Sequence, residues 1–322
     1  MKRKLYFAAF AAVALAACNE TLPTMADLEE GKLELEVNLP VALTKVTGEA
    51  EDDDVNSLQV FVFGTSGDLE AYGYKYADAL TLKCIPGPKT VVALVNAPLI
   101  PEIASYSELT STVSKLSNNV LKGLVMEGEL EIELTTSQRV VVPVSRLVAK
   151  ITLSKIENAL ELDYHQSMDF VLNSVYLINV AGDKKYLVDD PSETWINQGQ
   201  NEKGELGYLY DSLKDTKLWW GTSYTDKHYF YCYPNHTEQD SSDGQEWTPR
   251  YTRLVVEATL GGEKCYYPVS LPEVNQNTAY DISLKVTRPG SDSPDKPVST
   301  LAAEFTVEVE EWIPADAIEE II

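Results

Sequence analysis

The feature of this sequence that most limits its fold is a hydrophobic period of two that begins after Gly31. Leu33, Leu35, Val37 and Leu39 alternate with polar residues, which is the pattern of a strand that buries one face. Later short apolar runs are separated by turns rich in Gly, Pro, Asn and Asp, and this spacing is typical of β-sandwiches. The pattern predicts an all-β chain.

The expected strands form two series that meet near residues 143–147. They cover residues 32–39, 57–64, 79–85, 90–96, 129–135, 140–144, 146–153, 170–180, 228–233, 252–260, 264–269, 279–287 and 301–309. One helix is expected over 105–116, where Ser107 and Glu108 offer a cap, and residues 182–222 and 234–250 read as polar loops. We predict two antiparallel β-sandwich domains, one over 31–145 with the short helix and one over 146–322.

Residues 1–17 have the features of a secretory leader. Lys2, Arg3 and Lys4 precede an apolar run from Leu5 to Ala17, which is shorter than the roughly 20 apolar residues of a membrane-spanning helix. The small residues before Cys18 resemble the lipobox of bacterial lipoproteins, in which the cysteine carries lipid (palmitate, for example) and the leader is removed. We expect lipidation at Cys18, a tether over 18–30 and an outer-membrane precursor. An ordinary leader with a chance cysteine is the alternative.

The chain is strongly acidic, with a formal net charge of −24. Its predicted leader carries only basic charges, so the remainder is more negative still. Nucleic-acid phosphates and anionic lipid headgroups would both be repelled. The charge therefore argues against a nucleic-acid partner and indicates a well-solvated surface.

No arrangement of residues points to catalysis. His165, His228 and His236 lack the spacing of a metal site, and there is no GxSxG, P-loop or GxGxxG motif. The run 52–54 lacks the Gly and Glu of an EF-hand loop and reads as a solvated acidic turn. We predict no enzyme activity, metal ion or cofactor. Aromatic groups at 219–220, 229–233 and 266–267 are able to stack on sugars, but such residues more often fill a core or pair across strands.

Three cysteines remain once Cys18 is assigned to lipid, namely Cys84, Cys232 and Cys265. An odd number without a CxxC motif gives neither a disulfide framework nor a zinc site. Buried free thiols are favoured, and a pair between Cys232 and Cys265 is the alternative.

Several segments form an ordered series along the chain. They are the lipobox at Cys18, residues 43–47 (LTKVT), 55–63 (VNSLQVFVF), 92–97 (VALVNA), 124–128 (LVMEG), 146–151 (RLVAKI) and 229–235 (YFYCYPN), and a last strand that ends in Trp312. In this order they resemble the fimbrillins, the subunits of type V pili in Bacteroidales. The resemblance spans about residues 15–312.

The resemblance implies transthyretin-like β-sandwiches and a defined route of assembly. The lipoprotein reaches the cell surface, and a trypsin-like protease cuts after a basic residue between the first strand and the next. Lipid and strand leave together, and the C-terminal strand of another subunit fills the groove. The cut maps to Lys45, where relatives often carry Arg, so the mature chain would begin at Val46.

The two exchanged strands have matching patterns. Leu33, Leu35, Val37 and Leu39 form the apolar face of the removable strand. The donor strand, about residues 299–311, presents Leu301, Ala303, Phe305, Val307 and Val309. Main-chain hydrogen bonds are generic, so one alternating strand is able to replace another. The alternative is that 301–309 simply closes its own domain.

The sequence thus predicts a structural shaft subunit of a cell-surface fimbrium (pilus) that supports cell adhesion. Its expected partners are other copies of itself or related pilus subunits, the outer membrane before maturation, and a trypsin-like protease. A pilus anchor or tip subunit is the first alternative. A surface glycan-binding lipoprotein, with the Trp and Tyr groups as its site, is the second.

Overall fold

The computed structural model describes residues 31–39, 52, 54–100, 102–119, 123–201, 207–240, 246–298 and 302–312. The predicted leader, Cys18, Lys45, Val46 and Leu301 lie outside these residues.

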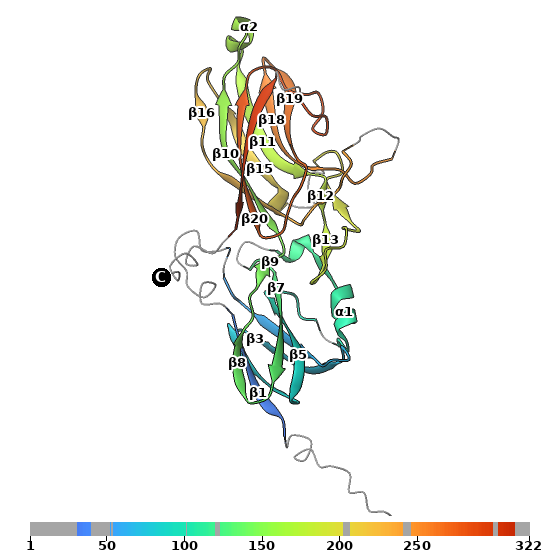
Figure 1. Cartoon of the computed structure of the whole chain (residues 1–322). Helices are drawn as coiled ribbons and strands as arrows, with labels where there is room; N and C mark the ends of the chain where they lie inside the picture. The colour runs from blue at the N-terminus through green and yellow to red at the C-terminus, as the bar shows by residue number, and fades with distance from the viewer. Residues whose placement is uncertain are drawn as a thin grey trace, which may run out of the picture.

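The lower half of the molecule in Figure 1 is built from two sheets. One has the strand order β3-β2-β5-β7-β9 and the other the order β4-β1-β8. The strands are β1 (Leu33–Asn38), β2 (Leu58–Phe63), β3 (Leu69–Lys75), β4 (Ala79–Cys84), β5 (Gly87–Val95), β7 (Met126–Leu134), β8 (Gln138–Val141) and β9 (Ser145–Arg146). A hydrophobic cluster that includes Leu35 and Val37 of β1 and Val60 and Val91 of the larger sheet fills the space between them.

The other face of the larger sheet packs against a short helix, α1 (Tyr106–Ser111), whose Leu109 joins Phe61 and Phe63 in a second cluster. The helix predicted over 105–116 is wrong beyond Ser111, because the next residues form β6 (Val113–Lys115) and the 3-10 turn η3 (Leu116–Asn118). Its cap is Ser105, whose hydroxyl accepts a hydrogen bond from the backbone N–H of Glu108, and the Glu108 carboxylate accepts one from the N–H of Ala104. The arrangement resembles a capping box, except that the Glu108 carboxylate bonds to the residue before the N-cap.

The upper half contains two larger facing sheets. In one, β10 pairs with β16, β17 and β20, and β20 pairs with β21; the other has the order β15-β11-β18-β19. The strands are β10 (Ala149–Asn158), β11 (Phe170–Ile178), β15 (Tyr210–Lys217), β16 (Ser223–Tyr224), β17 (His228–Cys232), β18 (Thr252–Leu260), β19 (Glu263–Leu271), β20 (Thr278–Val286) and β21 (Ala303–Glu311). The remaining elements are β12 (Val180–Ala181), β13 (Asp183–Lys185), β14 (Trp195–Ile196), α2 (Asp163–Gln166) and η4 (Gly207–Leu209).

The two halves are joined by backbone and by charge. Strand β13 of the upper half pairs with β6 of the lower half. Its Lys184 forms an ion pair with Glu127 of β7 at 3.2 Å, and both side chains are buried. The halves therefore share an interface that includes a desolvated ion pair, which holds them in one arrangement.

The all-β prediction is confirmed, since the described chain consists mostly of strands with two short α-helices. The loop predicted over 182–222 is wrong, because it contains β15. The side chains of β15 are almost all polar and exposed, so the strand lacks an alternating signal. Among the described residues, no helix is both long and apolar enough to cross a membrane.

Candidate functional site: two strands and the cluster between them

Strand β1 lies in the middle of its sheet. It pairs with β4 in antiparallel fashion, Leu33 to Cys84 through Asn38 to Ala79, and with β8 in parallel fashion. Leu35, Val37 and Leu39 are buried, and burying three such side chains contributes roughly 5–9 kcal/mol. The predicted alternation of β1 is thus confirmed, and removal of this strand would leave an apolar slot between β4 and β8.

The outer face of β1 is polar and held by few contacts. Glu36 accepts hydrogen bonds from Arg139 of β8, the shorter at 2.7 Å, and this bonding lowers the pKa of the Glu36 carboxyl. The pair is exposed, so it adds little to stability. What retains β1 is its buried face and its two rows of backbone hydrogen bonds.

Strand β21 is held on one side only. It pairs with β20 from Val286 opposite Ala303 to Thr278 opposite Glu311 and forms the edge of its sheet. Ala303 is buried and Phe305 packs partly against the core, but Val307 is 37% and Val309 57% exposed. Two of its apolar side chains are therefore only partly buried in their own domain.

The last described residue after β21, Trp312, reaches the boundary between the two halves and meets a compact group of residues there. We call Asp52, Arg146, Lys150, Tyr231 and Trp312 the junction cluster. Trp312 stacks on the Tyr231 ring, with centroids 5.9 Å apart, and the Arg146 guanidinium lies 4.3 Å from the Trp312 ring centroid. Arg146 also donates to the backbone carbonyl of Trp312 at 2.9 Å.

Asp52 occupies the opposite side of the junction cluster. Its carboxylate forms an ion pair with Lys150 at 2.6 Å and accepts a hydrogen bond from the Tyr231 hydroxyl. Burial lowers the pKa of Arg146 to about 10, and the Asp52 charge partly offsets this effect. Burial, and then the bond to Asp52, raise the pKa of the Tyr231 phenol far above its usual value. The prediction of a solvated acidic turn over 52–54 is wrong for Asp52, which is buried. Its carboxylate compensates the charges of Lys150 and Arg146.

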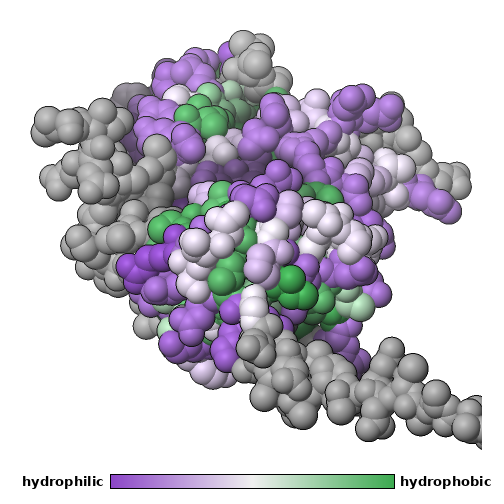
Figure 2. All heavy atoms as spheres, turned by 60° about the horizontal axis from the view of Figure 1, so that its bottom comes forward, coloured by the Kyte–Doolittle hydropathy of each residue, from purple (hydrophilic) through white to green (hydrophobic). Residues whose placement is uncertain are grey.

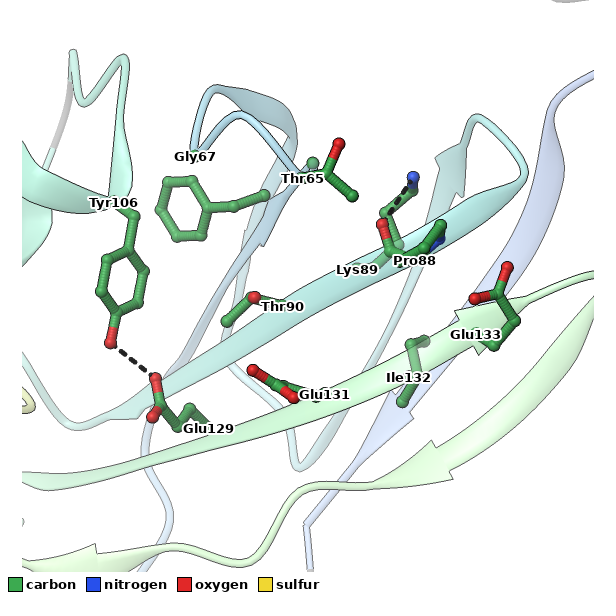
Figure 3. A pocket seen from close by; sticks show the side chains of 12 residues that line it. Thr65, Gly67, Pro88, Lys89, Thr90, Tyr106, Glu129, Glu131, Ile132 and Glu133 are labelled. Atoms are coloured by element: carbon green, nitrogen blue, oxygen red, sulfur yellow. Dashed lines mark hydrogen bonds between the residues drawn. The ribbon is translucent and has the colours of Figure 1, made fainter.

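A shallow depression of about 660 Å³ lies on the larger sheet of the lower half beside α1. Glu129, Glu131 and Glu133 of β7 point into it with Thr90 of β5, and the Tyr106 hydroxyl donates to Glu129 at 2.8 Å (Figure 3). Burial, and then this hydrogen bond, raise the pKa of Tyr106 to about 12. No group of carboxylates, His and Cys able to hold a metal ion occurs among the described residues.

His228 and the three cysteines of the described chain have structural positions. His228 lies between Asp211, at 2.6 Å, and the Tyr224 hydroxyl, at 2.8 Å, and so ties strand β17 to β15 and β16. Cys84, Cys232 and Cys265 are buried free thiols, which confirms the favoured interpretation. Burial raises the pKa of Cys84 to about 11 and that of Cys232 to about 12.

The aromatic groups singled out in the sequence differ in exposure. Tyr231 and Tyr267 are buried, as expected of core residues, whereas Trp219 and Trp220 are largely exposed. The spacing of these residues in the sequence does not predict this difference, because it depends on their place in the fold. Tyr231 and Tyr267 lie on strands β17 and β19, whereas Trp219 and Trp220 lie in the turn after β15.

Known proteins bear out the predicted resemblance. Residues 32–142 match the family model of the major fimbrial subunit protein (FimA). No curated protein is significantly similar to the chain.

Solved structures share the fold over most of the chain. A fimbrilin (FimA) from Porphyromonas gingivalis is 16% identical with a TM-score of 0.64, covering 88% of this chain and 99% of the other. A Bacteroides eggerthii protein named for a proposed role in cell adhesion is 16% identical with a TM-score of 0.65, covering 87% and 96%. The tip fimbrial protein Mfa3 of Porphyromonas gingivalis is 15% identical with a TM-score of 0.56, covering 87% and 100%. The chain therefore has the fold of fimbrial subunits.

Proposed function

We propose that this protein is a structural subunit of a cell-surface pilus and that it polymerises by donor-strand exchange. The observation that carries the proposal is the contrast between β1 and β21. Strand β1 fills a central slot with buried side chains, and β21 is an edge strand with exposed apolar ones. One strand leaves a vacancy that the other has the pattern to fill.

Loss of β1 would leave β4 and β8 as two facing edges with unpaired backbone groups. Such edges readily pair with a strand from another chain. Ala303, Phe305, Val307 and Val309 have the same spacing as Leu33, Leu35, Val37 and Leu39. Burial of the parts of Val307 and Val309 that are still exposed in the monomer favours insertion by roughly 0.5–1.5 kcal/mol each.

Maturation supplies the trigger for exchange. We propose lipidation at Cys18, transfer to the outer membrane, and cleavage after Lys45 by a trypsin-like protease. Lys45 lies between β1 and Asp52 in the sequence. Cleavage there separates β1 from the rest of the chain, whereas Asp52 stays attached within the junction cluster. The mature subunit would begin at Val46 and join the surface fimbrium.

The exchange treats the chain as two functional units. We propose an N-terminal acceptor domain over 31–145 and a C-terminal domain over 146–322 that carries the donor strand. The sheets support a boundary close to this one, because the sheets that hold β1 and β7 contain only strands up to β9, which ends at Arg146, and those that hold β10 and β11 only strands from Ala149 onward.

An anchor or tip subunit is the alternative role within the family. A tip protein shares this fold, so the fold does not separate a shaft from a tip. The donor strand favours the shaft, because a subunit that passes its strand to a neighbour and accepts one in turn lies inside a polymer.

Binding of a donor peptide to the cleaved subunit tests the proposal. The chain from residue 19 is cut with trypsin and mixed with a synthetic peptide of residues 299–312. We expect a one-to-one complex by native mass spectrometry. The matched control peptide carries Val307→Asp and Val309→Asp and should fail to bind, since its carboxylates would enter an apolar slot.

Binding to the uncut chain completes the test. The uncut chain should bind neither peptide, because β1 still fills the slot. Equal binding of both peptides to the cut chain, or absence of binding by the natural one, would contradict exchange.

A further inference from the structure

The donor strand begins at the end of the upper half that lies farthest from the lower half, near α2 at the top of Figure 1. The Ala302 carbonyl, directly before β21, accepts hydrogen bonds from the N–H groups of Thr287 and Arg288. The Thr287 carbonyl in turn accepts one from the N–H of Glu161. The root of the donor strand is therefore bonded, through one intervening segment, to the loop that carries α2.

Four large hydrophobic side chains are exposed on that same end. Leu162 and Tyr164 belong to the α2 loop, and Trp219 and Trp220 follow β15; their exposed fractions run from 48% to 69%. We call these four residues the end patch. The two loops touch, because the Trp220 indole N–H donates to the Leu160 carbonyl at 2.9 Å and the Asn158 amide donates to the Leu218 carbonyl at 2.9 Å.

The two indole rings of the end patch are held in place by the protein itself. Trp220 is fixed by its hydrogen bond to Leu160. The Lys217 ammonium lies 4.1 Å from the Trp219 ring centroid and forms an ion pair with Asp169 at 2.5 Å. Rigid, exposed aromatic side chains lose little entropy on binding, and Trp is enriched among residues that dominate interfaces.

The proposed strand exchange determines which part of a neighbouring subunit lies near the end patch. This step rests on the proposed function. Nine residues of extended strand span about 30 Å, and the 303–311 strand has that length. If it leaves β20 and enters a neighbour while its root stays bonded at Ala302, the acceptor domain of that neighbour must come to lie against the end patch.

The acceptor domain offers an apolar turn at the open end of its slot. Leu33 at the start of β1 pairs with Cys84, and the next residue, Ile85, is 55% exposed beside exposed Pro86 and Pro88. Figure 2 views this end and shows hydrophobic side chains among hydrophilic ones. The other end of the slot, at Asn38 and Ala79, faces the upper half of the same molecule (Figure 1).

We propose that Leu162, Tyr164, Trp219 and Trp220 form a second contact between successive copies of this chain, by packing on the Ile85–Pro88 turn at the mouth of the acceptor slot. The donor strand then runs in the direction of β1, with Ala303 at the place of Leu33. The end patch adds rigid-body contact to a joint that the strand alone would leave free to pivot.

A defined pair of subunits tests the contact. The donor copy carries Lys45→Ala and keeps its own β1, and the acceptor copy is cut at Lys45 and carries Val309→Asp, so only one joint is able to form. Trp219→Ala with Trp220→Ala in the donor copy should weaken the pair about 30-fold, which corresponds to about 2 kcal/mol. Tyr76→Ala in the acceptor, which removes an exposed aromatic ring at the other end of the slot, is the matched control and should change nothing.

Cross-linking locates the contact. Trp219→Cys in the donor copy and Ile85→Cys in the acceptor copy should be joined by a short bis-maleimide, and Tyr76→Cys in place of Ile85→Cys should not. Circular dichroism of each variant serves as the folding control, and normal binding of the 299–312 peptide confirms an intact slot.

The outcomes separate the contact from the exchange on which it rests. If the natural peptide fails to bind the cut acceptor, exchange and contact are both overturned. If the peptide binds but the tryptophan variant keeps full affinity, or Tyr76→Cys cross-links instead, the contact alone is overturned. Loss of retention on a polysaccharide column with unchanged pairing would assign the end patch to sugars and likewise overturn the contact.

Discussion

At the scale of single residues, the junction cluster shows how one side chain serves two segments that are remote in sequence. Arg146 donates to the carbonyls of Asp52 and Trp312. Asp52 follows the proposed cleavage site in the sequence, and Trp312 follows the proposed donor strand. A buried cation needs such partners, because desolvation is costly unless charge and hydrogen bonds compensate it. The cluster therefore fixes the far end of β21 in the monomer.

Loss of Trp312 should loosen that end. Trp312→Ala removes the stacking on Tyr231 and the cation–π contact with Arg146, together worth about 2 kcal/mol. We expect hydrogen exchange of the paired amides in β20 and β21 to speed up about 30-fold without global unfolding. Trp219→Ala, at the other end of the domain, is the control. Unchanged protection by mass spectrometry would show that β21 is held by its ladder alone.

At the scale of elements, the sequence predicted strands where the hydrophobic alternation was clear. The prediction failed where tertiary contacts determine the secondary structure. The strand over 252–260 was predicted with its observed bounds and β1 to within two residues, because their patterns are regular. Residues 113–115, which were predicted to be helical, instead form a strand that pairs with β13. Strand β15 was not predicted, because it is a polar edge strand bent by left-handed backbone at Lys214 and Asp215. The burial of Asp52 depends on cations almost a hundred residues away in sequence, so no local pattern predicts it.

Cys84 provides a natural probe of the slot. Its thiol is buried in the cluster that contains Leu35 and Val37, and burial raises its pKa to about 11, so it should resist alkylation at neutral pH. After cleavage at Lys45 and removal of the released strand, we expect rapid iodoacetamide labelling, read by peptide mass spectrometry. Addition of the 299–312 peptide should restore protection.

Cys232 and Cys265 serve as controls in the same sample, because they lie in the upper half. Labelling of all three thiols would mean general unfolding. A Cys84 that stays unreactive after strand removal would mean that the slot collapses and is not an acceptor.

At the scale of the whole molecule, slot and donor root lie at opposite ends. A head-to-tail contact of this kind is heterologous, and it generates an open filament unless the rotation between copies closes a ring. The position of the two features therefore suits a linear polymer of copies that share one direction.

Polymerisation should depend on a single basic residue. Lys45→Ala should leave the lipid-bearing precursor unpolymerised at the outer membrane, because β1 stays covalently attached in its slot. Lys32→Ala, which removes a basic residue on the other side of β1, should have no effect. Electron microscopy and N-terminal sequencing decide: wild-type polymer should start at Val46, and polymer that starts at residue 18 would refute the assignment.

The slot occupied by β1 also has a consequence for filament length. A subunit that keeps β1 is able to give a strand but not to receive one, so in the language of polymer chemistry it is monofunctional, whereas a cut subunit is bifunctional. In any step-growth process, a monofunctional unit ends the chain. The ratio of uncut to cut subunits at the cell surface would then set the mean degree of polymerisation, and the rate of one proteolytic step would determine how far the filament extends from the cell.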